Sequence, residues 1–369
     1  MESFDRSGTG SSKWARAGQG RIALGLADLD LPGPPEIGAA LAERARHPAY
    51  GYTVCDPGGR GLVADWYRER HGVAVDPEWV LLLPFGPRTA LRLLLGLAGP
   101  RRPVVFPTPE WGGFEQLCRS AGLPYRTVRL ARDADGYRLP VEDFAGAGLV
   151  LLSSPHNPSG RVWTRREIRG LAEQAAEAGG LLVSDEVHGD LVHPDLGLRQ
   201  PVAVSVAGEL ARHTVTLNSV GKTFNTSGIP SCFALVPDPA LRQRLTTRMA
   251  EYGLWEGGLL EQVVQQAALR HGGRWLDTLL DRLAANRELV VGALPEAVLS
   301  RPEASYLLWL DAVALGLPAV GAREVLLTER DVELSSGTDF GAEWAGCLRL
   351  NYALPAPLLR TALTRLTLR

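Results

Sequence analysis

The chain has 369 residues, of which 45% are hydrophobic and 22% are charged, and its formal net charge is −2. This length favours two domains over one small core, and a near-neutral charge without a basic block disfavours a nucleic-acid partner. No apolar run approaches the ~20 residues that cross a membrane. The four scattered cysteines form no C-x-x-C pair, which favours reduced thiols in the cytoplasm over a disulfide framework or a zinc knuckle.

The chain begins with the stretch MESFDRSGTGSSKWARAG, which is polar and rich in glycine. It lacks the apolar centre of a secretory signal. We therefore expect residues 1–18 to form a loose tail.

Short apolar runs alternate with helical patterns in the first two-thirds of the chain. The runs that we predict to be strands are 79–86, 102–109, 148–155, 181–187, 213–219 and 231–237. A helix is predicted over 164–180, with Thr164 as its N-cap and a glycine stop. Short apolar strands between helices are typical of a mainly parallel sheet that is covered on both faces. Ligands bind at the carboxyl ends of such strands, where the polar stretches SSPHN, DEVH and NSVGK lie.

The pattern changes near residue 250. Long amphipathic helices are predicted over 259–295, strands over 304–311 and 346–353, and a closing helix after residue 354. The α/β fold is therefore predicted to have a second, smaller α+β part. The predicted division is an N-terminal segment that joins the small domain (1–45), a large domain (46–258) and a small C-terminal domain (259–369).

Lys13 and Lys222 are the only lysines, and every other basic side chain is arginine apart from histidine. Arginine can replace a solvated lysine, but it cannot replace a lysine that must lose its proton. Lys222 lies in TLNSVGKTFNTSG, where GKT could end a phosphate-binding P-loop. However, Thr216 stands where a P-loop needs glycine, and Gly228 and Pro230 interrupt any following helix. The pattern favours a nucleophilic amine.

A lysine amine that loses its proton can form a Schiff base with an aldehyde cofactor such as pyridoxal phosphate (PLP). PLP also needs an acidic partner for its ring nitrogen, and Asp185 stands at the end of a predicted strand. Asn157 and His188 are placed to donate to the phenolic oxygen. His188 and His193 are five residues apart and not four as in H-E-x-x-H, which disfavours a metal site.

Four stretches, SSPHNPSGRVWT, SDEVHGDLV, SVGKTFNTSGI and CLRLNYA, occur in the order and at roughly the spacing of fold type I PLP enzymes. Each stretch alone also fits an ordinary turn, cap or core role. GLADLDLPGPPEIGAAL, HPAYGYT and ASYLLWLD are similar to segments of the MalY/PatB-like cystathionine β-lyases, a C–S lyase branch of this aminotransferase fold. The resemblance covers about residues 22–365. It implies a seven-stranded type of sheet between helices.

The resemblance also implies roles for individual residues. Those implied to bind the cofactor are Gly86, Pro87, Arg88, Trp111, Asn157, Asp185, His188, Ser219, Lys222 and Tyr52. Lys222 would bind the aldehyde and shuttle the proton, Trp111 would stack on the ring, and Tyr52 would reach the phosphate from a second subunit of a homodimer. Gly86 to Arg88 and Ser219 would hold the phosphate at a helix N-terminus. Those implied to contact the amino-acid substrate are Arg349, which would clamp its α-carboxylate, Asp28 and Tyr50.

Two positions depart from the family pattern. Gly221 replaces the serine that usually precedes the lysine, and Pro230 replaces an arginine or lysine, so that a cation for the phosphate is missing. Our hypothesis is that Arg88 supplies this charge from the other side of the phosphate.

The resemblance favours α,β-elimination on an S-substituted L-cysteine, which releases a thiol, pyruvate and ammonia. A role in sulfur tailoring of a secondary metabolite, as in antibiotic biosynthesis, fits this chemistry. Transamination and decarboxylating oxidative deamination of an S-alkylcysteine conjugate remain alternatives. A catalytically weak regulatory relative is an alternative of another class, and Pro230 is the feature that favours it.

Overall fold

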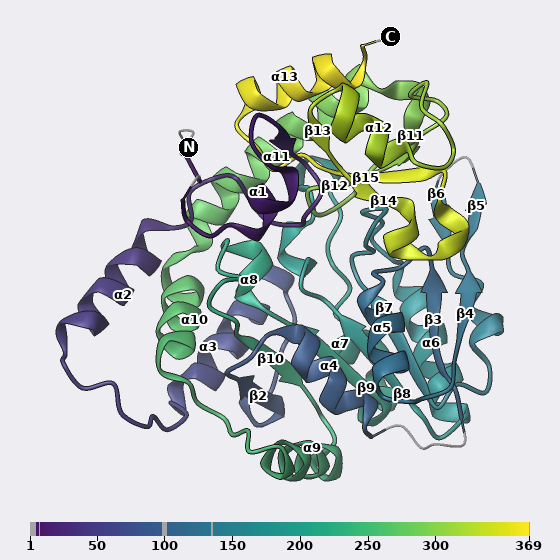
Figure 1. Ribbon diagram of the computed structural model, residues 1–369. Helices are drawn as coiled ribbons and strands as arrows, with labels where there is room; N and C mark the ends of the chain where they lie inside the picture. The colour runs from purple at the N-terminus through teal and green to yellow at the C-terminus, as the bar shows by residue number, and fades with distance from the viewer. Residues whose placement is uncertain (1–4, 7, 98–101, 134–135, 369) are drawn as a thin grey trace.

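The computed structural model describes residues 5–6, 8–97, 102–133 and 136–368 (Figure 1). Part of the predicted N-terminal tail, residues 1–4 and 7, lies outside the described residues. Within the described ranges, no helix is both long enough and apolar enough to cross a membrane.

Seven strands form the large sheet, in the order β2-β10-β9-β8-β7-β3-β4. Their bounds are β2 (Val80–Leu83), β3 (Val104–Thr108), β4 (Tyr125–Arg129), β7 (Leu149–Ser153), β8 (Leu181–Asp185), β9 (Thr214–Asn218) and β10 (Cys232–Leu235). The strands from β9 to β4 pair in parallel, and β10 pairs antiparallel with both of its neighbours. The predicted mainly parallel sheet is thus confirmed. A separate two-stranded hairpin consists of β5 (Ala131–Asp133) and β6 (Gly136–Arg138).

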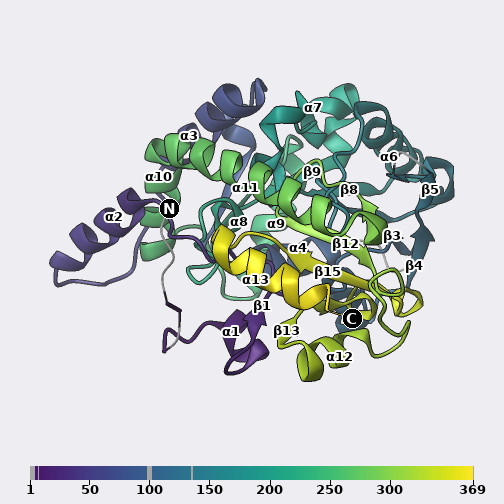
Figure 2. The same cartoon turned by 90° about the horizontal axis from the view of Figure 1, so that it is seen from above.

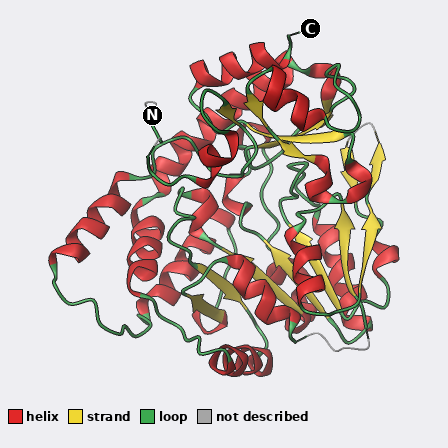
Figure 3. Cartoon of the chain, viewed as in Figure 1, coloured by secondary structure: helices red, strands yellow, loops and turns green. Residues whose placement is uncertain are grey.

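Helices cover both faces of this sheet (Figure 3). Successive residues of a strand point to opposite faces, and each face packs against its own layer of helices. Val104 and Phe106 of β3 belong to the core under α4, α5 and α9, whereas Val105 belongs to the core under α6 and α7. These helices and α3 have the bounds α3 (Gly58–Trp66), α4 (Pro87–Leu95), α5 (Gly113–Ser120), α6 (Arg165–Glu177), α7 (Ala203–Ala207) and α9 (Pro239–Glu251). Thr164 caps α6 in a capping box with Glu167, as its sequence position predicts.

A second, antiparallel sheet lies above the large one in Figure 1, and Figure 2 shows it from above. Its strands, in spatial order, are β11 (Val298–Ser300), β12 (Leu307–Asp311), β15 (Cys347–Asn351) and β14 (Ser335–Ser336). The helices after residue 258 are α10 (Leu259–His271), α11 (Gly273–Ala293), α12 (Ala322–Glu329) and α13 (Ala356–Leu366). The predicted small α+β part therefore forms.

The prediction of a loose N-terminal tail is wrong for its second half. Helix α1 spans Ser12–Ala17, and the Lys13 side chain in it is fully buried. Strand β1 (Ile22–Ala23) then pairs in parallel with β13 (Val332–Glu333), which ties the start of the chain to its C-terminal part. Helix α2 (Pro35–Arg46) projects from the body of the molecule (Figure 1). The polar composition of the tail gave no sign of these long-range contacts.

Glu186, the residue after β8, has a buried carboxyl that should make the stability of the fold depend on pH. It accepts hydrogen bonds from Ser184 Oγ and from the Ala203 backbone nitrogen, both at 2.9 Å. Burial raises the pKa of Glu186 from 4.5 to about 8. The folded state therefore binds more protons than the unfolded state in this pH range. The protonated Glu186 carboxyl contributes its full stabilisation below the pKa of the unfolded state, and this stabilisation is lost as the pH rises through about 8.

Glu186→Gln should consequently flatten the fall in unfolding free energy between about pH 5 and about pH 8, by at most about 1.4 kcal/mol per pH unit. Urea unfolding of the cofactor-free protein at both pH values measures the difference from wild type. Glu173→Gln on the exposed side of α6 is the control and should leave the slope unchanged. Equal slopes for wild type and Glu186→Gln would contradict the prediction.

Candidate active site

Lys222 lies in a short helix, α8 (Val220–Thr223), directly after β9. The helix begins with a cap, because Ser219 Oγ accepts from the Gly221 backbone nitrogen at 3.0 Å. It ends after one turn, where Asn225 adopts a left-handed conformation with a φ of 60°. Lys222 Nζ donates to the Ala27 carbonyl at 2.6 Å. Burial lowers the pKa of the amine, and the charge of Arg349 lowers it further, against the opposing effects of Asp28 and Asp185.

The Lys222 side chain reaches a cavity of about 250 Å³ at the carboxyl ends of the large-sheet strands. All but one of the residues implied to bind the cofactor line this cavity, and so does Arg349. The lining residues from the predicted set are Gly86, Pro87, Arg88, Trp111, Asn157, Asp185, His188, Ser219, Lys222 and Arg349. The remaining ones are Leu26, Ala27, Ser153, Val187, Gly221, Ser227, Pro230 and Ser231. The structure thus brings together side chains from segments far apart in the chain.

Three predicted residues do not line the cavity of their own chain. Tyr52 is 99% exposed and Tyr50 is 61% exposed, both in the segment after α2. Asp28 adjoins the lining residue Ala27, but its carboxylate forms an ion pair with Arg6, with Asp28 Oδ2 2.9 Å from Arg6 Nη2.

Two titratable groups at the floor of the cavity have pKa values far from their usual range. Burial raises the pKa of Asp185 from 3.8 to about 7, while the charge of Lys222 opposes this rise. Burial lowers the pKa of His188 to about 3, so its imidazole is neutral, and its Nδ1 lies 3.0 Å from Ser305 Oγ. Among the described residues, no group of three or more histidine, cysteine, aspartate or glutamate side chains is arranged to hold a metal ion.

Arg349 of β15 contributes a buried cation to the wall of the same cavity. Its Nη1 donates to Asn157 Oδ1 at 2.9 Å, and its Nη2 donates to the Gly25 carbonyl at 2.8 Å and to Ser335 Oγ at 3.2 Å. Burial lowers its pKa to about 10, which still leaves it charged at neutral pH. Arg349 Nε is buried without a hydrogen-bond partner. A buried donor without a partner is costly, and an anionic ligand would satisfy it.

The other end of the cavity has the features of an anion site. Gly86 and Pro87 begin α4 there, and the free backbone N–H groups of a helix N-terminus favour anions. Ser231 Oγ is buried without a hydrogen-bond partner. The Arg88 guanidinium lies 5.8 Å from the centre of the Trp111 ring and donates to Gln116 Oε1 at 2.7 Å.

Sequence reasoning missed Glu110, which lies behind the wall formed by Trp111 and Ser153. Its carboxylate accepts from the Trp111 backbone nitrogen and from Ser153 Oγ, both at 2.7 Å. Ser153 Oγ in turn accepts from the Asn157 backbone nitrogen at 3.0 Å. Burial raises the pKa of Glu110 to about 8. The available signal was a charged residue directly after a buried strand in FPTPEWGGF.

The comparisons with known proteins agree with this geometry. Residues 22–366 match the family model of aminotransferase class I and II. The chain is 32% identical to cystathionine beta-lyase PatB of Bacillus subtilis (strain 168), over 98% of this chain and 97% of PatB. It is 26% identical to protein MalY of Escherichia coli (strain K12), over 95% and 93% of the two chains.

A solved structure leads to the same conclusion. Cystalysin from Treponema denticola, whose crystal structure contains a pyridoxal 5'-phosphate cofactor, has a TM-score of 0.91 and 25% identity to this chain. The similarity covers 100% of this chain and 97% of cystalysin. From the match over residues 22–366 and these full-length similarities, we conclude that the chain belongs to the aminotransferase class I and II family.

Proposed function

We propose that the protein is a PLP-dependent carbon–sulfur lyase that cleaves an S-substituted L-cysteine. The observation that carries this proposal is the meeting, in one cavity, of the Lys222 amine, the buried Asp185 carboxyl and the Arg349 guanidinium. The similarity to PatB, a cystathionine beta-lyase, favours C–S cleavage among the reactions open to the family.

The cavity fits PLP on the evidence of its own side chains. Lys222 offers an amine for the aldehyde, and Asp185 offers an acid for the ring nitrogen. The N-terminus of α4 and the unpartnered Ser231 Oγ suit the phosphate. When bound, PLP supplies an electron-withdrawing ring that stabilises negative charge on the substrate's Cα.

The residues around the PLP ring would each hold or transfer a proton, or orient the cofactor or the substrate. Asp185 keeps the ring nitrogen protonated, and Asn157 and His188 hold the phenolic oxygen. Lys222, with its lowered pKa, takes the proton from the substrate's Cα as a general base. The Cα–H and Cβ–S bonds break, the sulfur leaves as a thiol, and hydrolysis of the remaining fragment gives pyruvate and ammonia.

Arg349 would orient the substrate for this proton transfer. Arg349, whose Nε is unpartnered, lines the same cavity as Lys222, and an arginine fork matches a carboxylate in geometry and charge. Binding the α-carboxylate there leaves the Cα–H bond to be presented to the Lys222 amine. Asp28 and Tyr50 remain proposed contacts for the rest of the substrate.

We expect Arg88 to contribute to cofactor affinity because Pro230 leaves the phosphate without the usual cation. Arg88→Met should weaken PLP binding about tenfold, the effect of losing one charge-assisted hydrogen bond. Titration of the cofactor-free protein with PLP, followed by visible absorption, measures the dissociation constant. Arg92→Met, one turn further along α4 and outside the cavity lining, is the control. Unchanged affinity in Arg88→Met would show that this charge is not used.

The exposed segment after α2 supports a homodimer with shared active sites. Tyr50, Tyr52 and Val54 are all well exposed there, and Tyr52 would enter the partner's cavity. The four cysteines are free thiols, which supports the cytoplasm as the compartment. We retain 1–45, 46–258 and 259–369 as the proposed division of the chain.

Product analysis after incubation with S-alkyl-L-cysteines tests the proposed reaction. A lyase releases pyruvate and a thiol in equal amounts. A keto acid that keeps its thioether would instead show transamination, and carbon dioxide release would show the decarboxylating deaminase. Failure of a PLP-loaded protein to turn over any S-substituted cysteine would favour the regulatory alternative. If the protein is active, comparison of S-conjugates from a panel would define the natural substituent.

A further inference from the structure

Leu26 and Ala27 line one side of the cavity, and the backbone segment Gly25–Asp28 that contains them contacts two reactive side chains of the cavity. The Gly25 carbonyl accepts from Arg349 Nη2 at 2.8 Å, and the Ala27 carbonyl accepts from Lys222 Nζ at 2.6 Å. Asn351 Nδ2 donates to the Leu26 and Asp28 carbonyls, at 2.7 Å and 2.8 Å. Consecutive carbonyls therefore fix the segment to β15 and direct the amine and the guanidinium. A shift of this segment would move both groups.

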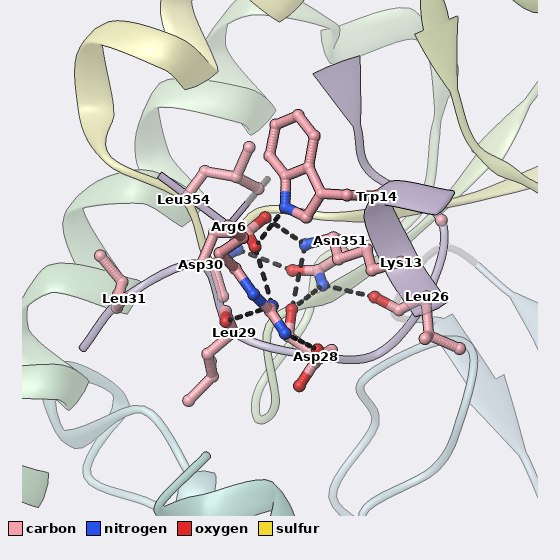
Figure 4. Close-up of polar contacts among 12 residues, drawn as sticks. Arg6, Lys13, Trp14, Leu26, Asp28, Leu29, Asp30, Leu31, Asn351 and Leu354 are labelled. Atoms are coloured by element: carbon pink, nitrogen blue, oxygen red, sulfur yellow. Dashed lines mark hydrogen bonds and ion pairs between the residues drawn. The ribbon is translucent and has the colours of Figure 1, made fainter. Parts of the chain in front are cut away.

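A buried cluster of charges holds the far end of this segment in place (Figure 4). The Asp30 carboxylate accepts from Lys13 Nζ at 2.7 Å, from Trp14 Nε1 at 2.9 Å and from Arg6 Nη1 at 3.0 Å. Lys13 Nζ also donates to the Asp28 carbonyl at 3.0 Å. Lys13 thus connects α1 to the Asp28 backbone at the end of the segment and to the Asp30 side chain two residues beyond it.

The cost of burying Lys13 indicates that its position matters. Its side chain has no exposed surface, burial lowers its pKa, and the charge of Asp30 raises it. Replacing such a pair by apolar groups is often neutral or stabilising, so stability alone does not explain it. The chain uses arginine at almost every other basic position, yet keeps lysine here. The compact ammonium meets two acceptors in a closed space, which a planar guanidinium with five N–H donors does not match.

We propose that Lys13 and Asp30 are positioning residues for the reaction, because their ion pair fixes the Gly25–Asp28 carbonyls that direct Lys222 and Arg349. The expected fall in kcat/KM rests on the proposed function. The expected loosening of the backbone segment rests on the contacts alone. Neither Lys13 nor Asp30 lines the cavity. Both act through the backbone between them and the cavity.

The experiment compares wild type with Lys13→Met, Asp30→Asn and the double variant. Hydrogen–deuterium exchange of the cofactor-free protein should be at least about fivefold faster at the amides of 24–31 in each single variant. In the PLP-loaded protein, the absorption change of the bound cofactor with pH should shift its midpoint down by about half a unit, because the Ala27 carbonyl favours a protonated Lys222 nitrogen. We expect kcat/KM to fall about tenfold or more. The double variant should lose no more than the worse single variant, since both remove one interaction.

Asp195→Asn is the matched control, because it removes one of the two carboxylates that pair with Arg287, a second buried cation outside the cavity lining. Asp195→Asn should lower the melting temperature. It should change neither the pH midpoint of the cofactor's absorption nor the hydrogen–deuterium exchange of the amides of 24–31. If Lys13→Met and Asp30→Asn behave in the same way as this control, the pair is only structural and the inference is overturned. Asp30→Asn keeps the side-chain shape, so the test survives if Lys13→Met does not fold. A wild-type protein that does not bind PLP would overturn the proposed function, whereas unchanged variants of a PLP-binding wild type would overturn this inference alone.

Discussion

Replacing Lys222 by alanine is expected to lower kcat/KM for pyruvate release by about three orders of magnitude or more. The variant loses both the amine that holds the cofactor and the general base, and a general base alone contributes about 10²–10⁴-fold. Lys222→Arg should be as inactive, because arginine keeps the length and charge but does not give up its proton. Pyruvate release by variants that have been saturated with PLP measures the effect.

The circular dichroism spectrum and the melting temperature provide the control for folding in both Lys222 variants. Since Lys222 lies in a one-turn helix at the cavity, we expect the rest of the fold to remain intact. Activity of Lys222→Arg within tenfold of wild type would contradict a catalytic role for the amine.

The Asp185→Asn substitution should lower kcat by about two to four orders of magnitude. Asparagine keeps the shape of the side chain but removes the charge that would hold a proton on the ring nitrogen. Removal of one partner from a buried ion pair costs about 3–5 kcal/mol, which corresponds to a rate effect of this size. Asp185 is well placed for this role because it is buried at the end of β8 and lines the cavity.

Glu186→Gln is a matched control for Asp185→Asn. The two carboxyls are adjacent in sequence and both are buried, but Glu186 turns away from the cavity toward Ser184 and Ala203. We expect Glu186→Gln to retain activity within about tenfold. Equal losses in the two variants would show that a buried carboxyl at this place matters only for folding.

The sequence contained enough information to predict the large sheet and the centre of the site. Continuous apolar runs of β-branched and leucine residues are recognisable without partners, since both faces of the parallel strands are buried. Polar residues at the ends of these runs, such as Asp185 after LLVS, then fall together because parallel strands end at one edge. The position of Arg349 came from the family motif and not from its local pattern.

The N-terminal part of the site could not be predicted in this way. Lys13 is buried because Asp30, 17 positions later, returns to it, and β1 lies beside β13 from the other end of the chain. A local pattern carries no record of such distant partners, so a polar, glycine-rich stretch predicts only a tail. Tyr52 poses a related problem, because its predicted partner is a second copy of the chain.

The most direct test of the account is borohydride reduction of the PLP-loaded protein followed by mass mapping of its peptides. Reduction makes the bond between a lysine and the cofactor permanent, so the modified residue can be identified. We predict a yellow protein that bleaches on reduction and carries the cofactor's mass on the peptide that contains Lys222. A colourless protein under excess PLP, or a label on Lys13 in place of Lys222, would contradict the account.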